Sequence, residues 1–239
     1  MKNSKFVTDE IYHIYNRGVD KRIIFLDDQD RFHFIHDLFE FNDQRPAPPL
    51  NIAARKLHRQ SLEDDLPMVG VKLDRGPREF LVEILAFCLM DNHFHLMLRQ
   101  RIENGITLFM RKLGTGYANY FNRKYKRTGR LFEGIFKSVR LAQESHFIHL
   151  PYYIHLNPLD YSMPQWRNKE VESAPKAMEY LEKYRWSSHL DYMGIKNFPS
   201  VTQRDFLLSF FDGDRGYKEK FLKQLQDFSK DNLDLIMLE

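Results

Sequence analysis

Histidines alternate with apolar residues from position 93, where the sequence reads His-Phe-His-Leu-Met-Leu. Successive side chains of a strand point to opposite faces of a sheet. His93 and His95 therefore share one face of the predicted strand, and the phenylalanine and leucines share the core face. A nearly continuous apolar run at 80–90 predicts a buried strand just before it, and Asp91-Asn92 predicts the turn of a hairpin.

The other periodicities complete an α+β pattern. Residues 11–16 and 132–141 alternate as strands, whereas about 28–41 and 106–125 carry apolar residues at helical spacing. The resulting order is strand, helix, strand, strand, helix, strand. This is the ferredoxin-like βαββαβ arrangement, an antiparallel sheet with helices on one face. We expect the opposite face to be uncovered and the two histidines to point to it.

Two segments lie outside this pattern. Residues 43–78 hold three closely spaced prolines and then charged residues with little periodicity, which indicates an inserted surface loop with a short helix near 51–60. Beyond Pro158 the chain becomes polar and irregular, with short amphipathic helices predicted at 203–211 and 217–228. We expect a domain at 1–160 and a C-terminal helical extension at 161–239 with a structural role.

Residues 144–157 read as a mostly apolar helix with one polar side. At 100° per residue, a wedge of roughly 80° contains His146, His149, Tyr153 and Asn157. Such a helix is buried with its wedge against something polar. Tyr152 lies about 100° away from that wedge and should pack in the core. The alternative is a core helix in which Tyr153 only makes a hydrogen bond.

Charge is unevenly distributed along the chain. The net charge is +3, but residues 99–140 hold eleven Lys and Arg against two acids, whereas the remainder holds 25 bases and 31 acids. A basic block on an otherwise acidic chain indicates a polyanionic partner. The single cysteine, Cys88, excludes an intramolecular disulfide and fits a reducing compartment. We see no signal peptide or membrane-spanning run, and expect a cytoplasmic, nucleoid-associated protein without membrane contact.

Two imidazoles on one strand face can converge on a divalent metal, because neutral imidazole is the commonest protein ligand for metals. A His-x-His pair is a weak signal by itself, and a polar strand face with two structural histidines is the alternative.

Several motifs together resemble the REP-associated tyrosine transposases, within the single-tyrosine HUH superfamily. The matching pieces are Tyr12–Val19, Leu89–Leu96, Asn122–Ser138, Tyr153–Pro158 and Trp186–Ser188. They span most of residues 10–195. The His-x-His and the Tyr-x-x-x-Asn-Pro are the most specific; the others are supporting pattern.

The resemblance implies a ferredoxin-like fold, a divalent metal, Mg²⁺ or Mn²⁺, on His93 and His95, and Tyr153 as the nucleophile. Asn157 occupies the position of a third metal ligand. The implied reaction is cleavage and rejoining of single-stranded or hairpin DNA through a 5′-phosphotyrosine, by a monomer or homodimer. His149 is a candidate proton acceptor.

The sequence departs from the family pattern in three places. Asp91 stands where proline is usual, and Ile135 where arginine is common, which puts one DNA contact in doubt. The 43–78 insertion is also longer than expected.

The basic block is expected to track DNA phosphates, with Tyr125 and nearby aromatics stacking on unpaired bases. The residues assigned to DNA contact are Asn16, Arg17, Arg111, Lys112, Arg123, Lys124, Lys126, Arg127, Arg130, Lys137 and Arg140. Two other functions remain open. One is a metal-dependent nuclease in which water attacks, and the other is a nucleic-acid-binding module without catalysis, since such sheets also bind RNA.

Overall fold

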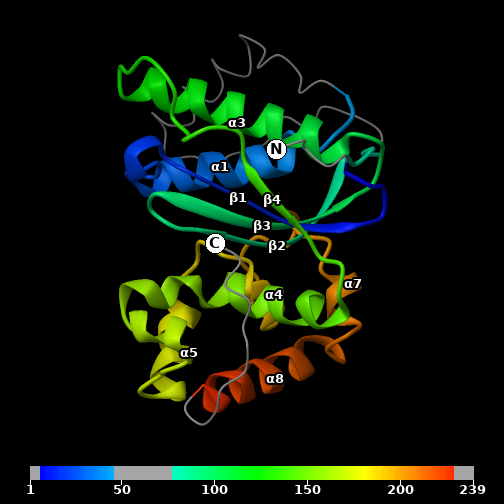
Figure 1. Ribbon diagram of the computed structural model, residues 1–239, viewed down its shortest axis with the longest axis vertical. Coiled ribbons are helices and arrows are strands. Elements are labelled where there is room, and N and C mark those ends of the chain that lie inside the picture. The colour runs from blue at the N-terminus through cyan, green and yellow to red at the C-terminus, as the bar shows by residue number, and fades with distance from the viewer. Residues whose placement is uncertain (1–5, 46–76, 229–239) are drawn as a thin grey trace, which may run out of the picture.

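The sheet has the strand order that the sequence predicts. A computed structural model describes residues 6–45 and 77–228. Its four strands are β1 (Ile11–Arg17), β2 (Val82–Leu89), β3 (His93–Gln100) and β4 (Lys137–Arg140). They lie in the order β2-β3-β1-β4 with every neighbouring pair antiparallel. This is the ferredoxin-like topology, and Figure 1 shows the sheet near the middle of the molecule.

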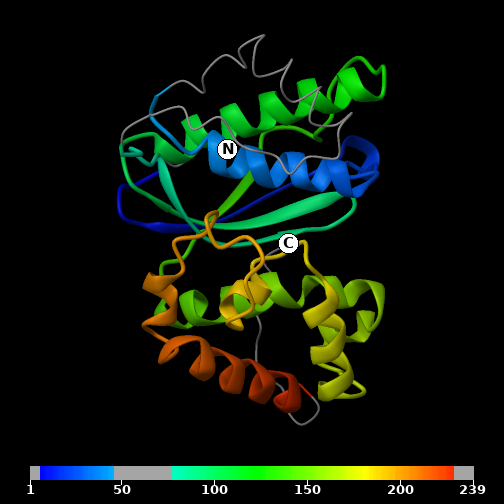
Figure 2. The ribbon, with the colours of Figure 1, turned by 180° about the vertical axis from the view of Figure 1, so that it is seen from behind.

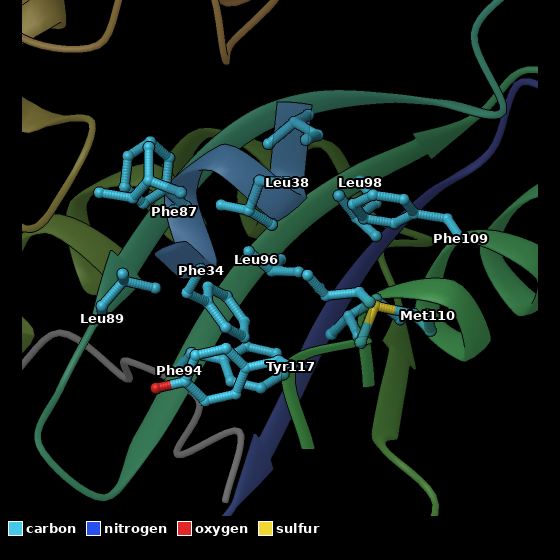
Figure 3. Packing of buried hydrophobic residues seen from close by; sticks show 14 of the residues in the cluster. Phe34, Leu38, Phe87, Leu89, Phe94, Leu96, Leu98, Phe109, Met110 and Tyr117 are labelled. Carbon is cyan, nitrogen blue, oxygen red and sulfur yellow. The ribbon is translucent and has the colours of Figure 1, made fainter. Parts of the chain in front are cut away.

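Two helices, α1 (Asp28–Glu40) and α3 (Gly105–Lys124), cover one face of the sheet (Figure 1). The Asp27 side chain caps α1 by accepting a hydrogen bond from the amide of Asp30. Gly116 lets α3 approach α1, because a Cβ there would lie 2.4 Å from the Phe41 ring. Figure 3 shows the core between these helices and the sheet, which includes Phe34, Leu38, Phe94, Leu96, Leu98, Phe109 and Tyr117.

The second face of the sheet is covered, contrary to the expectation from sequence. A second layer of helices packs there, beginning with α4 (Glu144–Leu156) and continuing through the C-terminal part of the chain (Figures 1 and 2). The side chains of Cys88 and Met97 point to this side of the sheet. They belong to the second apolar cluster, which also contains Ile154 and Leu156. The molecule therefore has three layers, helices, sheet and helices.

Besides α4, this layer contains the long α8 (Gly213–Asp227) and the short α7 (Asp205–Leu208) and α6 (His189–Tyr192). The remaining helix, α5 (Ala174–Lys183), was not expected from the sequence. It begins at Ser173, whose hydroxyl accepts from the amide of Lys176. Two 3-10 turns, η2 (Asn157–Tyr161) and η3 (Pro164–Asn168), connect α4 to α5. The boundary at residue 160 stays a prediction.

The last strand is shorter than predicted. β4 begins at Lys137, whereas the alternation indicated a start at 132. Residues before it follow a different path, since the amide of Glu133 donates to the carbonyl of Arg17 and Phe132 forms an isolated bridge with Gly18. Residues 46–76, which include the predicted 51–60 helix, lie outside the described residues, so only the two ends of the insertion are seen.

The second helical layer is joined to the sheet by buried hydrogen bonds as well as by apolar contacts. The amide of Leu89 donates to the carbonyl of Trp186, and the amide of Ser188 donates to that of Phe87. The Ser188 hydroxyl also lies 2.7 Å from Nε2 of His155, whose Nδ1 lies 2.6 Å from the Tyr217 hydroxyl. No helix within the described residues is long and apolar enough to cross a bilayer.

These buried histidines predict acid sensitivity. Burial lowers the pKa of His189 to about 3 and that of His155 well below its usual value. The unfolded chain takes up a proton at each site below about pH 6.5, whereas the folded chain does not. Stability should therefore fall as the pH drops from about 6.5, by about 1.4 kcal/mol per pH unit for each histidine. His189→Phe, which keeps a ring beside Phe221, should remove one histidine's share, as measured by urea unfolding at pH 7.5, 6 and 5. A variant with the wild-type pH slope would contradict this.

Candidate metal and nucleophile site

The two histidines of β3 form a pair on the face of the sheet that α4 covers. Their ring centres are 5.0 Å apart and the rings are perpendicular. His95 is 1% exposed, whereas His93 is half-buried. The predicted sharing of one strand face is confirmed, because Phe94, Leu96 and Leu98 all lie in the core on the other side.

Each histidine of the pair has its Nδ1 atom occupied by a neighbour. Nδ1 of His93 lies 2.6 Å from Oδ1 of Asn92, and Nδ1 of His95 lies 2.9 Å from Nε2 of His13. Metal-binding imidazoles commonly donate their second ring N–H to such an acceptor. With both Nδ1 atoms donating, Nε2 carries the lone pair in each ring. Nε2 of His95 is buried and has no hydrogen-bond partner among the described residues.

His13 is the residue of this site that the sequence reasoning missed. It lies on β1, where alternation puts it on the same face as Tyr15, and β1 pairs with β3 so that Tyr15 is opposite His95. Burial lowers the pKa of His13 to about 3, and the pKa of His95 also lies well below its usual value, mainly through burial. Both rings are therefore neutral at pH 7, which is the form that binds metals.

The pair fits a divalent cation as two imidazoles that are each oriented by a neighbour at Nδ1. Within the described residues, no third His, Cys, Asp or Glu joins them to make a cluster of three. A third protein ligand must then be of another type, such as the amide oxygen predicted at Asn157.

α4 brings Tyr153 to the pair. The Tyr153 ring meets the ring of His95 edge-on at 5.6 Å and that of His13 at 5.9 Å between centres. Tyr152 points to the other side and packs on Phe211 and Tyr217 in the second core. The predicted helix phase is confirmed for these two tyrosines.

Asn157 is buried at the end of α4, where Pro158 follows it. Its Nδ2 donates to the carbonyl of Tyr153 at 2.7 Å, and its Oδ1 accepts from Nη2 of Arg167 at 3.2 Å. An amide oxygen has two lone pairs, so one remains for a metal. The guanidinium beside it disfavours a second cation, and the role of Asn157 as third ligand stays a prediction.

Arg167, on η3, is the second functional candidate that the sequence reasoning missed. Asp160 holds its guanidinium through two hydrogen bonds of 2.6 and 2.9 Å, and the same carboxylate accepts from Nε1 of Trp166 at 2.7 Å. From this anchored position Nη1 lies 3.5 Å from the Tyr153 hydroxyl. One arginine therefore contacts both Tyr153 and Asn157.

The other predicted candidate on α4 is placed less closely. His149 lies one turn before Tyr153 and is half-buried, and its Nδ1 is enclosed without a hydrogen-bond partner among the described residues. Burial, and to a lesser extent the charge of His146, lowers the pKa of His149. It is therefore a neutral base at pH 7, but its role in proton transfer stays a prediction.

The sequence of the site matches a known family. Residues 59–157 match the family model described as transposase IS200 like. The matched residues make up about two fifths of the chain. This segment contains the two histidines of β3, Tyr153 and Asn157, and leaves out β1 and Arg167. A solved structure described as a REP-associated tyrosine transposase bound to a REP hairpin aligns with 11% identity and a TM-score of 0.44, covering 83% of this chain and 88% of that chain. No curated protein matches the sequence.

The residues predicted to contact DNA divide into those that already contact another part of the protein and those that are exposed. The engaged ones are Asn16 with the carbonyl of Gly134, Arg17 with Glu133, Lys112 with the carbonyl of Asp43, Lys124 with Asp27 and Asp30, Arg127 with Asn122, and Arg140 with Glu10. The exposed ones are Arg111, Arg123, Lys126, Arg130 and Lys137. The second group is the better candidate for phosphate contact, because it need not break an internal contact first.

The structure shows a contact for one of the two positions that depart from the expected pattern, and exposure for the other. Oδ1 of Asp91 accepts from Nη2 of Arg31 at 2.5 Å, which fixes the hairpin turn to α1. Ile135 is 76% exposed in the segment before β4, so an apolar side chain stands in solvent there.

The hydrogen bond between His13 and His95 predicts a measurable effect on metal affinity. His13→Leu keeps a buried side chain at this position but removes the hydrogen-bond partner of Nδ1 of His95. We expect Mn²⁺ affinity to fall about 10- to 100-fold, as loss of such a partner typically costs. His13→Gln restores an acceptor oxygen and should recover part of the affinity. Electron paramagnetic resonance titration of free Mn²⁺ measures both, and an unchanged dissociation constant in His13→Leu would contradict the assignment.

Proposed function

We propose that the protein cleaves and rejoins single-stranded DNA by transesterification, with Tyr153 as the nucleophile. The carrying observation is the packing of the Tyr153 ring against His95, which brings a phenol to a metal-competent histidine pair. The family match supports this, because the matched segment includes the tyrosine and both histidines. The resemblance to REP-associated tyrosine transposases leads us to propose a hairpin-bearing strand as substrate.

The reaction exchanges one phosphodiester bond for another. The Tyr153 oxygen attacks a backbone phosphorus and loses its proton, the bond from phosphorus to the 3′ oxygen breaks, and that oxygen leaves as a 3′-hydroxyl after taking up a proton. The phosphate at the 5′ end of the downstream fragment stays attached to Tyr153, and the upstream fragment ends in the free 3′-hydroxyl. Because the phosphotyrosyl ester keeps the bond energy, a second 3′-hydroxyl can reverse the step and join a new strand.

The side chains around Tyr153 would position the phenol, bind the metal and accept the phenol proton. Arg167 holds the phenol oxygen and the Asn157 amide in fixed relation, and its own position is set by Asp160. His93 and His95 would hold Mg²⁺ or Mn²⁺, with Asn157 proposed as the third ligand. When bound, such an ion polarises the scissile phosphate and neutralises developing charge. His149 is proposed as the acceptor of the phenol proton.

A water-dependent nuclease is the second candidate, and one observation favours it. Tyr153 is 8% exposed, so a phosphate must approach a nearly covered phenol. In that reading Tyr153 packs against the histidines and water attacks instead. The two reactions differ in their product, since only the first leaves protein covalently joined to DNA. A binding module without catalysis would leave the DNA uncut.

Two adjacent tyrosines provide the matched test of the nucleophile. Tyr153→Phe removes only the hydroxyl, so folding and DNA affinity should persist while the covalent adduct disappears. Tyr152→Phe, made in the apolar core one residue away, should leave most of the adduct. Hairpin-bearing single strands with Mn²⁺ or Mg²⁺, followed by a denaturing gel, provide the readout. DNA cleavage that persists in Tyr153→Phe would support attack by water and contradict the proposal.

Replacing Arg167 should lower the rate of adduct formation without lowering the affinity for DNA. Arg167→Met removes the group that orients Tyr153 and Asn157, and displacement of a reacting group by about 1 Å costs on the order of 100-fold in rate. We expect adduct formation to slow about 10- to 100-fold while DNA affinity stays within about twofold. Arg167→Lys should recover little, because one ammonium cannot reproduce the planar set of donors.

Arg185→Met is the control for this change. Arg185 lies in the same C-terminal part of the chain, over the rings of Phe32 and Trp186, away from Tyr153. Equal slowing in both arginine variants, or weaker DNA binding as the main effect of Arg167→Met, would contradict a positioning role.

A further inference from the structure

One row of residues crosses the sheet on the face that carries the histidines. In register, His95 of β3 lies opposite Tyr15 of β1, and Tyr15 lies opposite Lys137 of β4. Directly paired residues of antiparallel strands point to the same face. Neighbouring strands are about 4.8 Å apart. Tyr15 is thus one strand away from His95, and Lys137 is two strands away.

The aromatic residue in this row is held flat beside the histidines. The Tyr15 ring is stacked on His13 at 5.0 Å and 29°, and on His95 at 5.8 Å and 30°. It is half-buried, so part of the ring faces solvent. An aromatic plane that is fixed by its neighbours loses little side-chain entropy when a base stacks on it.

The cation at the end of the row is accessible. Lys137 is exposed, and its Nζ lies 5.7 Å from the centre of the Tyr15 ring. Arg17 and Arg140 on the paired strands are neutralised by Glu133 and Glu10, whereas Lys137 forms no ion pair with a described residue. None of the four residues of β4 is buried, so this edge of the sheet is open on both faces.

We propose that Tyr15 and Lys137 form a nucleotide subsite beside the scissile phosphate, in which the base stacks on Tyr15 and the next phosphate binds Lys137. This subsite rests on the proposed function, because the reacting phosphate at His95 defines its start. The single strand then leaves the site across β1 and β4, in the direction where the sheet is uncovered. A duplex cannot use this subsite, since its bases are already stacked and paired, so the subsite selects unpaired DNA.

Binding can be tested apart from cleavage, with the full chain in EDTA. The probes are a fluorescein-labelled dT12 and the same backbone without bases, measured by anisotropy. Tyr15→Leu should weaken dT12 binding about 5- to 100-fold, the range for loss of one stacked base, and leave the abasic strand unchanged. Tyr15→Phe keeps the ring and should bind as wild type. Lys137→Gln should reduce the slope of log affinity against log salt by about 0.7, the value for one phosphate on a single strand.

Phe210→Leu and Lys183→Gln are the controls, and neither should change binding. Phe210 is an exposed aromatic residue in the turn between α7 and α8, and Lys183 is an exposed lysine of α5. The subsite is overturned by a Tyr15→Leu variant that binds dT12 as wild type, or that loses affinity equally for both strands. Loss of dT12 binding in Tyr15→Phe, or an unchanged salt slope in Lys137→Gln, overturns it as well.

A second measurement places the subsite relative to the cleaved bond. Once the adduct maps the cleavage position, a single abasic residue next to it should slow adduct formation by wild type and add nothing to the slowing in Tyr15→Leu. Additive effects would overturn the placement. Failure of the proposed function is distinguishable, because wild type would then form no adduct at all while the base-dependent binding persists.

Discussion

The rest of the site depends on the packing of α4 against the sheet face that carries the histidines. α4 is apolar around most of its circumference, and α1 and α3 already occupy the other face of the sheet. Burying a large apolar side chain contributes about 1.5–3 kcal/mol, whereas a hydrogen bond contributes about 1 kcal/mol net. The contacts of Tyr152, Ile154 and Leu156 therefore set the phase of α4. Once they are buried, Tyr153 has no other direction than toward His13 and His95.

Local periodicity was sufficient for the parts of this arrangement that depend on one element at a time. The alternation at β3 predicted the shared face of His93 and His95. Helical spacing predicted that the side chains of Tyr152 and Tyr153 point to different sides of the helix. The role of His13 could not be predicted, because it depends on the register between β1 and β3, which the sequence does not specify. Arg167 reaches Tyr153 through a 3-10 turn whose path depends on Pro164 and on the anchoring Asp160.

The covering of the second sheet face was the largest difference from the sequence expectation. The C-terminal helices carry few apolar residues in sequence, but each turns them to one side, so α5 and α8 bury Leu181 and Phe221 while looking polar overall. The sheet supplies the complementary surface with Cys88 and Met97, although the alternation in β3 placed Met97 on the face of the two histidines, which was expected to be uncovered. As a consequence, α4 covers the site over β2 and β3, whereas no residue of β4 is buried by the described part of the chain. The basic block contributes less free charge there than its composition suggests, because Lys124 and Arg140 are already paired.

Identifying the residue that becomes attached to DNA tests the proposed mechanism most directly. Digestion of the wild-type adduct with a nuclease and a protease, followed by tandem mass spectrometry, locates the nucleotide-bearing side chain. The account predicts a phosphate-linked nucleotide on Tyr153 and an unmodified Tyr152 in the same peptide. A linkage on Tyr152 or on any other residue, or cleaved DNA without a linked peptide, would contradict it.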